Sequence, residues 1–300
     1  MAAEANAVGH DARLSASGRI VRSHDRDRFM ATLVVPHDRR EAILTVYAFN
    51  HEVAKIADAV SEPIAGQMRF QWWWDAIAEA VEQDAPVRMH EVATPLGETI
   101  RRFGLHREPF EQILTVREDH DLAQDPQPAT LSGLEAYAEG TAATPFAIAL
   151  SILKHSPEHP RQPPEAEMEA VRHMGTAWGL AGTIRAVPHL ARRRQCRMPA
   201  DLLAAKGVDR GDVIEGRASA GLAEVVHEIA DRAADHLNRA RRLRRDIGKD
   251  SIRLLAGCCL VDAHLKRLQQ ARWNPFDPRL AHPPPLRIVP MAVRSWLNRY

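Results

Sequence analysis

Apolar side chains recur every three or four residues along much of this 300-residue chain. The clearest stripes lie within residues 46–60, 222–240 and 254–268. This spacing places the apolar side chains on one face of an α-helix, so it predicts amphipathic helices that pack against one another. No segment alternates polar and apolar residues convincingly, and no Asn-Gly or Asp-Gly pair marks a hairpin. The sequence therefore predicts an all-α fold.

The chain is long enough to form one helical domain with a sizeable core, because 45% of its residues are hydrophobic. Prolines fall between the periodic segments, where helices are expected to begin or end. We find no internal repeat and no domain boundary. We expect a flexible N-terminal arm over residues 1–22, a single-domain helical bundle over residues 23–285, and a short amphipathic helix over residues 286–300.

The predicted last helix has two chemically different sides. Arg294 and Arg299 lie on one side, and the other side carries Val293, Trp296, Leu297 and Tyr300. A short basic amphipathic helix of this kind can lie on an anionic membrane surface. Packing of the helix onto the domain is an equally good interpretation.

Charge and cysteine content exclude several classes of protein. Forty Lys and Arg residues against 39 Asp and Glu leave a net charge of +1, which gives no general attraction to nucleic acid. Three cysteines form neither a disulfide framework nor a zinc motif, so we expect a reducing compartment. Residues 1–18 have no apolar core typical of a secretory signal. We expect a cytoplasmic protein, with peripheral contact at the inner face of the membrane as an option.

Several separated blocks of the sequence resemble one enzyme family. The blocks are Arg26–Phe29, Tyr47–Val53, Ser61–Pro63, Gln71–Trp73, Tyr137–Thr141 and Asn274–Phe276. Between about residues 26 and 287 the chain resembles the squalene/phytoene synthase family. The residues of these blocks are similar to those of one family branch with degenerate Asp-rich motifs. That branch includes the mitochondrial assembly factor for respiratory complex I. The resemblance implies an isoprenoid-synthase-like helical bundle.

The resemblance also locates the two metal-binding motifs of the catalytic relatives. The Asp-Asp-x-x-Asp of the first motif falls on Ala54, Lys55 and Asp58. The second motif, which follows Arg185, falls on Ala186, His189 and Leu190. Only Asp58 remains of the carboxylates. Since Mg²⁺ prefers oxygen ligands, this chain has lost most of what the family uses to hold Mg²⁺ and prenyl diphosphate.

The side chains that remain near these motifs are the candidate site. Asp58 is the one candidate metal ligand, although an ion pair with Lys55 is the simpler interpretation. Arginines after Arg185 can bind phosphate without metal, or they can form a solvated run at a helix end, where Pro188 is expected to end or kink the helix. The candidate residues for an anion or prenyl diphosphate are His51, Lys55, Asp58, Tyr137, Arg185, His189, Arg193 and Arg197.

Three functions are compatible with this pattern. The loss of carboxylates favours a non-catalytic protein, which by resemblance is an assembly or interaction factor for complex I and contacts its subunits or assembly intermediates. The first alternative is an active head-to-head prenyl transferase, for which Mg²⁺ would be needed; otherwise we expect no cofactor. The second is a metal-free module for phosphate or anionic lipid. Among the aromatic residues, Trp72 and Trp73 are expected to pack, whereas Trp74 is a candidate surface ring for a partner.

Overall fold

The computed structural model describes residues 14–60, 62–82, 86–156, 162–282, 288–297, 299 and 300. These residues form helices and connecting loops, with no strand among them, and this confirms the predicted all-α fold. The α-helices are α2 Ala16–His24, α3 Arg26–Thr32, α4 His37–Ala54, α5 Pro63–Val81, α6 Ala93–Phe103, α7 Glu108–Asp121, α8 Leu131–Ala138, α9 Thr144–Lys154, α10 Glu165–Arg192, α11 Ala200–Ala205, α12 Arg210–Ile214, α13 Ala220–Arg242, α14 Lys249–Leu255, α15 Cys258–Gln270 and α16 Ile288–Trp296. Four shorter helical segments are η1 Ala57–Ala59, η2 Glu139–Ala143, η3 Leu243–Asp246 and η4 Pro278–Leu280.

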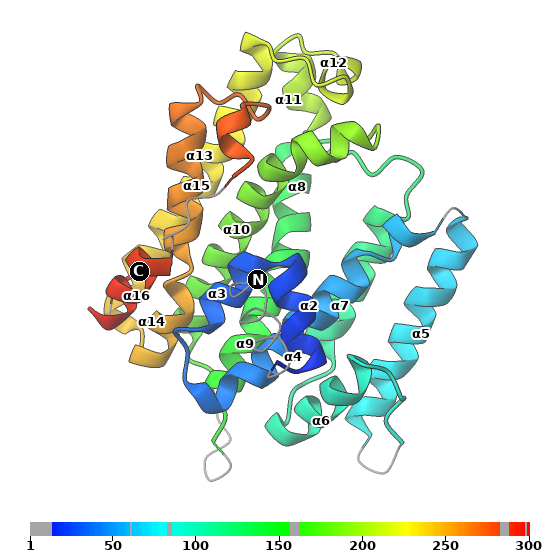
Figure 1. Ribbon diagram of the computed structural model, residues 1–300, viewed down its shortest axis with the longest axis vertical. Helices are drawn as coiled ribbons and strands as arrows, with labels where there is room; N and C mark the ends of the chain where they lie inside the picture. The colour runs from blue at the N-terminus through cyan, green and yellow to red at the C-terminus, as the bar shows by residue number, and fades with distance from the viewer. Residues whose placement is uncertain (1–13, 61, 83–85, 157–161, 283–287, 298) are drawn as a thin grey trace, which may run out of the picture.

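Helix α10 is the central element of the bundle (Figure 1). It packs along α13 and against α8, η2 and α9, while α4 packs against α9 and α2. Helices α5, α6 and α7 lie on the opposite side of the molecule from α13, α15 and α16 (Figure 1). This arrangement brings the two motif regions, at the C-terminal ends of α4 and α10, into one part of the molecule.

The predicted apolar stripes form the core. In α4, Val46, Phe49 and Val53 are buried, and the Phe49 ring contacts the rings of Trp73 and Phe110 edge-on at centroid distances of 5.2 and 5.6 Å. The stripe of α13 is buried in the same way against α10. Edge-on aromatic pairs and the exclusion of apolar surface from water both stabilise this packing.

The centre of the bundle is closely packed at the family block Tyr137–Thr141. The chain there changes from α8 into a π-helical turn, η2, which lies against α10. Gly179 permits this contact, because a Cβ on it would lie 2.7 Å from the Cβ of Ala138. Gly175 faces Ala143 at still closer range. The family block therefore contributes backbone contact with α10 in addition to the Tyr137 side chain.

Two local predictions differ from the structure. Residues 16–22, expected in a flexible arm, belong to α2, which packs on α4 and buries Val21; residues 1–13 lie outside the described part of the chain. The Ser15 side chain caps this helix by accepting a hydrogen bond from the Gly18 amide at 2.9 Å. Pro188 does not end α10, which continues to Arg192. Whether residues 1–22, 23–285 and 286–300 are separate units stays a prediction.

The aromatic and C-terminal predictions also need correction. Trp74 is only partly exposed: its ring packs on the core and its Nε1 donates a hydrogen bond to Glu118 Oε2 at 3.0 Å. Tyr300 is buried, and its hydroxyl donates to the carbonyl of Ala240 at 2.9 Å, so it anchors the C-terminus to α13 and does not share the exposed side of the last helix. No helix in the described residues is long and apolar enough to cross a bilayer.

Candidate ligand cleft and charged clusters

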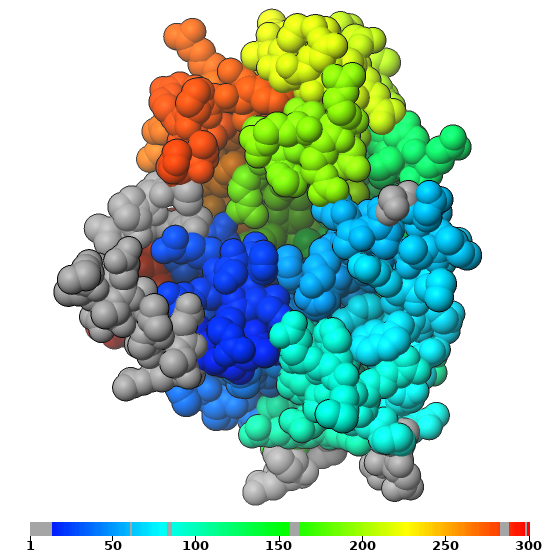
Figure 2. All heavy atoms as spheres, turned by 45° about the vertical axis from the view of Figure 1, so that its right-hand side comes forward, coloured from blue at the N-terminus to red at the C-terminus, as the bar shows by residue number. Residues whose placement is uncertain are grey.

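A cleft of about 680 Å³ opens between α2 and α3, the C-terminal half of α10, α15 and the η4 segment. We call it the Arg185 cleft. Figure 2 shows the surface hollowed where the blue α2–α3 segment, the green end of α10 and the orange end of α15 meet. Its size is typical of a site for one small ligand. The polar side chains that line it are His24, Asp25, Arg26, Asp27, Arg185, His189, Arg192, His264, Arg267 and Asp277.

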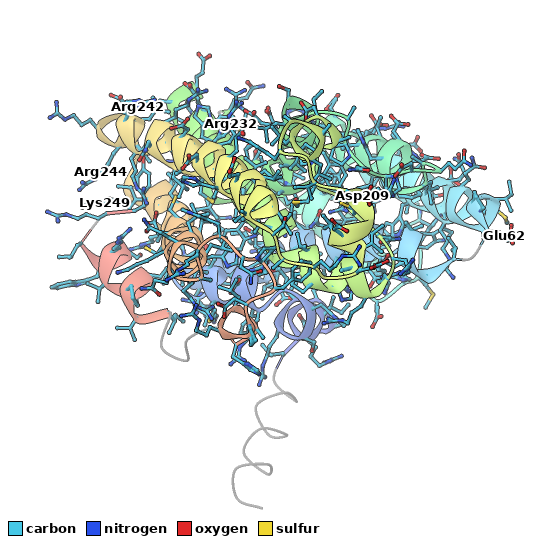
Figure 3. The ribbon with its side chains drawn as sticks, turned by 90° about the horizontal axis from the view of Figure 1, so that it is seen from above. Glu62, Asp209, Arg232, Arg242, Arg244 and Lys249 are labelled. Atoms are coloured by element: carbon cyan, nitrogen blue, oxygen red, sulfur yellow. The ribbon has the colours of Figure 1, made fainter. Side chains whose placement is uncertain are left out.

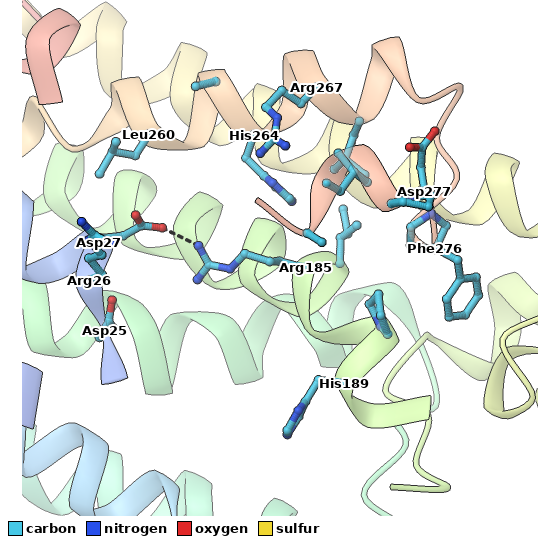
Figure 4. Close-up of a pocket in the computed structure, with 18 of the residues that line it drawn as sticks. Asp25, Arg26, Asp27, Arg185, His189, Leu260, His264, Arg267, Phe276 and Asp277 are labelled. Atoms are coloured by element: carbon cyan, nitrogen blue, oxygen red, sulfur yellow. Dashed lines mark hydrogen bonds and ion pairs between the residues drawn. The ribbon is translucent and has the colours of Figure 1, made fainter. Parts of the chain in front are cut away.

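An ion pair crosses the Arg185 cleft. Arg185 Nη1 lies 2.5 Å from Asp27 Oδ2, and the two side chains come from α10 and α3 (Figure 4). Asp27 is largely buried, whereas the Arg185 side chain is 51% exposed. The second motif arginine is therefore partly neutralised by a carboxylate of the protein.

His264 projects from α15 toward Arg185 and Arg267 (Figure 4). Its Nε2 is buried and makes no hydrogen bond within the described structure. Burial, and to a smaller extent the positive charges of Arg185 and Arg267, together lower the pKa of His264 to about 4. At neutral pH this imidazole is uncharged, and its Nε2 has no hydrogen-bond partner among the described residues.

The other cationic side chains at the cleft differ in whether the protein already binds them. Arg267 is held by the chain, because it donates to the carbonyl of His282 at 2.9 Å and to that of Arg279. Arg192 and His189 are exposed at the C-terminal end of α10. Asp25 and Asp277 add negative charge to the lining. The cleft is thus of mixed charge, with its available cations at the end of α10.

The cleft is closed toward the centre of the bundle. A recess of about 20 Å³ continues from Asp27 and His264 to Trp178. The guanidinium carbon of Arg28 lies 5.8 Å from the Trp178 ring centroid and 5.1 and 5.4 Å from those of Phe146 and Tyr47. Arg28 also forms an ion pair with Asp25 at 2.8 Å. Arg28 is thus a buried cation held by three aromatic rings and a carboxylate next to the recess residue Trp178.

A second group of charged residues is buried beyond the cleft, around Asp121. We call Arg117, Asp121, Tyr137 and Arg197 the Asp121 cluster. Arg197 and Arg117 lie 2.7 and 3.1 Å from the carboxylate oxygens of Asp121, whose side chain is 3% exposed. Tyr137 donates to Asp121 at 2.8 Å and accepts from Arg197 at 2.7 Å. The carboxylate, the phenol and both guanidinium groups therefore have partners inside the protein.

The electrostatics of the Asp121 cluster follow from these contacts. Burial alone opposes ionisation of Asp121, but the guanidinium groups of Arg117 and Arg197 hold its pKa below the usual value. Burial likewise opposes the charge on Arg197, whereas Tyr137 and Asp121 outweigh it and raise the Arg197 pKa. Burial raises the pKa of Tyr137. With one carboxylate for two guanidinium groups the four side chains carry a net charge of +1, and both guanidinium groups are bound to the same carboxylate inside the protein.

The first motif lies across the end of its helix. Helix α4 ends at Ala54, and Asp58 lies in the separate turn η1. Lys55 pairs with Glu52 at 2.5 Å, and Asp58 pairs with Arg193 at 2.7 Å. The predicted Lys55–Asp58 pair is therefore wrong, because the helical spacing on which it depended does not continue past Ala54. The surviving motif carboxylate instead joins the two motif regions through an arginine.

These residues do not fit the Mg²⁺ that the family implies. Asp58 is engaged by Arg193, and the five other motif positions carry Ala54, Lys55, Ala186, His189 and Leu190. In the described part of the chain, no group of three or more His, Cys, Asp or Glu side chains is placed to hold a metal ion. A hard cation needs several oxygen ligands, and the cations of the protein compete for the one carboxylate present.

The predicted site residues do not form one site. Arg185 and His189 line the cleft; Tyr137 and Arg197 belong to the Asp121 cluster; Asp58 and Arg193 pair with each other at the surface. His51 stacks on the cleft residue His24, with ring centroids 4.4 Å apart. Burial lowers the His51 pKa, and the nearby His24 charge adds to this effect.

Sequence reasoning missed the partners of these residues. None of the partners Asp27, Asp121, His264 and Arg267 is among the candidate residues that the sequence predicts. Asp27 lies within the family block Arg26–Phe29, and this is the sequence feature that could have pointed to it as a site residue. No sequence feature marks His264 as a site residue, because its helix reaches the cleft only through the tertiary fold.

Comparison with known proteins agrees with this architecture. The family described as squalene/phytoene synthase matches residues 21–287. Complex I assembly factor 6 of Bos taurus is 28% identical over 305 residues, covering 99% of this chain and 88% of that protein. Presqualene diphosphate synthase of Rhodopseudomonas palustris is 27% identical over 216 residues, covering 72% of this chain and 73% of that protein.

The solved structure of a dehydrosqualene synthase has the same fold. It superposes with a TM-score of 0.78 at 18% identity, covering 95% of this chain and 96% of that chain. At this identity the likeness concerns the fold, whereas the family match extends over most of the sequence. On these grounds the chain belongs to the squalene/phytoene synthase family.

Proposed function

We propose that this protein is a non-catalytic member of its family and acts as an assembly or interaction factor for respiratory complex I. The observation that carries the proposal is the ion pair between Asp58 and Arg193 at 2.7 Å. It engages the last motif carboxylate with a cation of the other motif region. The names of the relatives support the same role, since the bovine protein aligned along almost this whole chain is a complex I assembly factor.

Head-to-head prenyl transfer is the alternative that this geometry opposes. Such an enzyme must hold two prenyl diphosphates and stabilise the charge of a departing diphosphate, which its relatives do with metal ions. Here the motif residues lack the oxygen ligands, and the cleft is sized for one small ligand. The relationship to a presqualene diphosphate synthase keeps this alternative worth testing.

Two measurements separate these functions. Purified protein with farnesyl or geranylgeranyl diphosphate and Mg²⁺ or Mn²⁺ should release no pyrophosphate above a blank. Metal-dependent turnover that is abolished in Asp58→Ala would overturn the non-catalytic assignment.

In cells, deletion of the gene should lower NADH–quinone reductase activity and leave carotenoid or hopanoid content unchanged. Normal complex I in the deletion strain would overturn the assembly role.

A complementation series sharpens the cellular test. Because we propose that Asp58 has no catalytic role, a plasmid-borne Asp58→Ala gene should restore NADH–quinone reductase activity as well as the unaltered gene does. The buried Phe49 provides the negative control: Phe49→Asp places an unpaired charge in the core and should abolish folding and complementation together.

The Arg185 cleft supports a second candidate function, the binding of a small anion without metal. Its supporting feature is the group of Arg192, His189 and neutral His264 around one cavity. Pyrophosphate in the presence of a chelator should then raise the melting temperature by mass action, and Arg192→Ala should reduce the shift. Arg69→Ala, which removes an exposed arginine of α5 outside the cleft lining, is the matched control. No shift at millimolar pyrophosphate would contradict this function.

For the location, we propose the cytoplasm with peripheral contact at the inner face of the membrane. The proposed partners are complex I subunits or assembly intermediates, and nucleic acid is not among them. The near balance of 40 basic and 39 acidic residues supports the exclusion of nucleic acid.

A further inference from the structure

The outer face of α16 is apolar, which is unusual for a helix at the surface of a protein. Four large apolar side chains of α16 and of the turn that follows it face solvent: Val289, Val293, Trp296 and, just after the helix, Leu297 are 49%, 48%, 81% and 48% exposed. Their spacing of four, three and one residues places them on one face. The exposed positions between them, Pro290 and Ala292, carry no charge either. A contiguous apolar face of this kind marks a contact site.

The opposite face of α16 holds the helix on the protein. Met291 and Ser295 are buried, and α16 packs on α15 and α3. Arg294 pairs with Asp262 of α15 at 3.2 Å, and Asp262 also pairs with Arg241 at 2.6 Å. The only charged side chain of α16 is therefore directed to the protein. The helix is fixed with its apolar face outward.

A basic segment lies at the same end of the molecule. Residues 239–253 contain seven Lys and Arg residues against two Asp, so the segment has an excess of five positive charges. Tyr300, which follows α16, binds the carbonyl of Ala240 at 2.9 Å and so ties the C-terminus to the start of this segment. Figure 3 shows Arg242, Arg244 and Lys249 projecting from the end of the molecule where the α16 ribbon lies.

We propose that α16 and the basic segment together form a docking surface for a bilayer with anionic headgroups. The apolar face would enter the interface between headgroups and acyl chains, where Trp is favoured, and the arginines and lysine would contact the headgroup phosphates. Charge complementarity favours an anionic bilayer over a protein partner or a neutral lipid surface, because an exposed apolar face with a cationic segment at the same end of the molecule matches both the acyl and the headgroup layer of such a membrane. The proposal identifies the surface for the peripheral contact proposed above and is independent of the complex I role.

Co-sedimentation of the purified full-length protein with vesicles tests the proposal. Binding is expected to phosphatidylcholine vesicles that contain phosphatidylglycerol, with little binding to phosphatidylcholine alone. The double variant Val293→Asp/Trp296→Asp should weaken binding by at least about tenfold, since it replaces buried apolar area with charge at the interface. The variant Arg242→Glu/Arg245→Glu should weaken binding to anionic vesicles by about fivefold for each base removed and should reduce its salt dependence.

The chain offers a matched control at its opposite side. Ile64 and Met68 of α5 are 64% and 70% exposed, also on one helical face, and Ile64→Asp/Met68→Asp should bind vesicles like the unaltered protein. Both pairs are exposed, so unchanged melting curves are expected for both variants. Equal loss of binding in the two variants, or no binding of the unaltered protein to anionic vesicles at low salt, would overturn the proposal. A dimer in lipid-free solution that only the α16 variant dissociates would assign the surface to a second copy instead.

Discussion

The Asp121 cluster and the Arg185 cleft use the same residue types for opposite purposes. Each contains arginines near a family motif and a carboxylate of the protein. In the Asp121 cluster a 3% exposed carboxylate binds two guanidinium groups, and a buried phenol completes the network. In the cleft, Arg185 is half exposed and Arg192 and His189 face solvent. Whether an arginine can bind a ligand therefore depends on the carboxylate opposite it and on the water around it.

This difference assigns the two regions to different tasks. Buried charges are tolerated only when they are paired and hydrogen-bonded, so the Asp121 cluster holds α7, α8 and the Arg197 loop in one arrangement. The charge of Arg192 at the open end of the cleft is solvated, contributes little to stability and is free to exchange partners. Three measurements test the comparison.

The largest effect is expected from Asp121→Ala. Removal of this carboxylate leaves Arg117 and Arg197 as uncompensated buried cations, which costs about 3–5 kcal/mol in the free energy of unfolding. Asp125→Ala is the matched control, because Asp125 lies four residues away and forms an exposed pair with Arg210 at 2.5 Å. It should cost less than about 1 kcal/mol. Urea unfolding of both variants makes the comparison. A similar loss in the free energy of unfolding of the two variants would mean that the Asp121 cluster contributes no more to stability than an exposed ion pair does.

The sequence predicted the fold better than it predicted this cluster. The stripe with Val46, Phe49 and Val53 and the separated family blocks led directly to an all-α bundle, because apolar periodicity depends on local spacing. The partners of Arg197 and Arg193 are Asp121 and Asp58, which lie far away in sequence. No local pattern marks such a pair. Arginines that the sequence grouped as one anion site are thus divided by the tertiary fold.

Two further predictions, for Lys55 and for Trp74, differ from the structure because they relied on local spacing. The expected Lys55–Asp58 pair required α4 to continue beyond Ala54, but the chain turns there and Lys55 pairs with Glu52. The sequence predicts Trp74 at a partner surface, because the rings of its neighbours Trp72 and Trp73 are expected to pack in the protein. A hydrogen bond to Glu118, on the distant helix α7, brings it onto the core. A local turn decided the first case, and a contact between residues 44 positions apart decided the second.

The second effect concerns His264 and the pH dependence of stability. Its pKa is about 4 in the folded protein against 6.5 for an ordinary histidine, so the unfolded chain binds the extra proton first as pH falls. Stability contributed by the neutral imidazole is complete above pH 6.5 and is lost between pH 6.5 and 4, by about 3 kcal/mol at most. His264→Leu should remove this slope from urea unfolding measured at pH 7 and pH 5.

His189→Leu is the control for this experiment, because His189 is exposed on the same cleft and should leave the slope unchanged. His51 and His173, whose pKa values burial also lowers, keep a residual slope in both variants. An identical slope in His264→Leu and the unaltered protein would show that the inner end of the cleft is as well solvated as its mouth. The contrast between buried and open regions would then fail inside the cleft itself.

The smallest effect is expected at the Asp58–Arg193 pair, where the two side chains are 49% and 34% exposed. A double-mutant cycle with Asp58→Ala and Arg193→Ala should give a coupling energy below about 1 kcal/mol, as is usual for solvated pairs. The same variants test the metal question, since Arg193→Ala releases the carboxylate from its cation. A lone carboxylate supplies too few ligands for Mg²⁺, so millimolar Mg²⁺ should not raise the melting temperature of Arg193→Ala. A rise in Arg193→Ala that is absent in the double variant would make the arginine a replacement for a lost metal ion, and the pair would then mark a metal site that one substitution reopens.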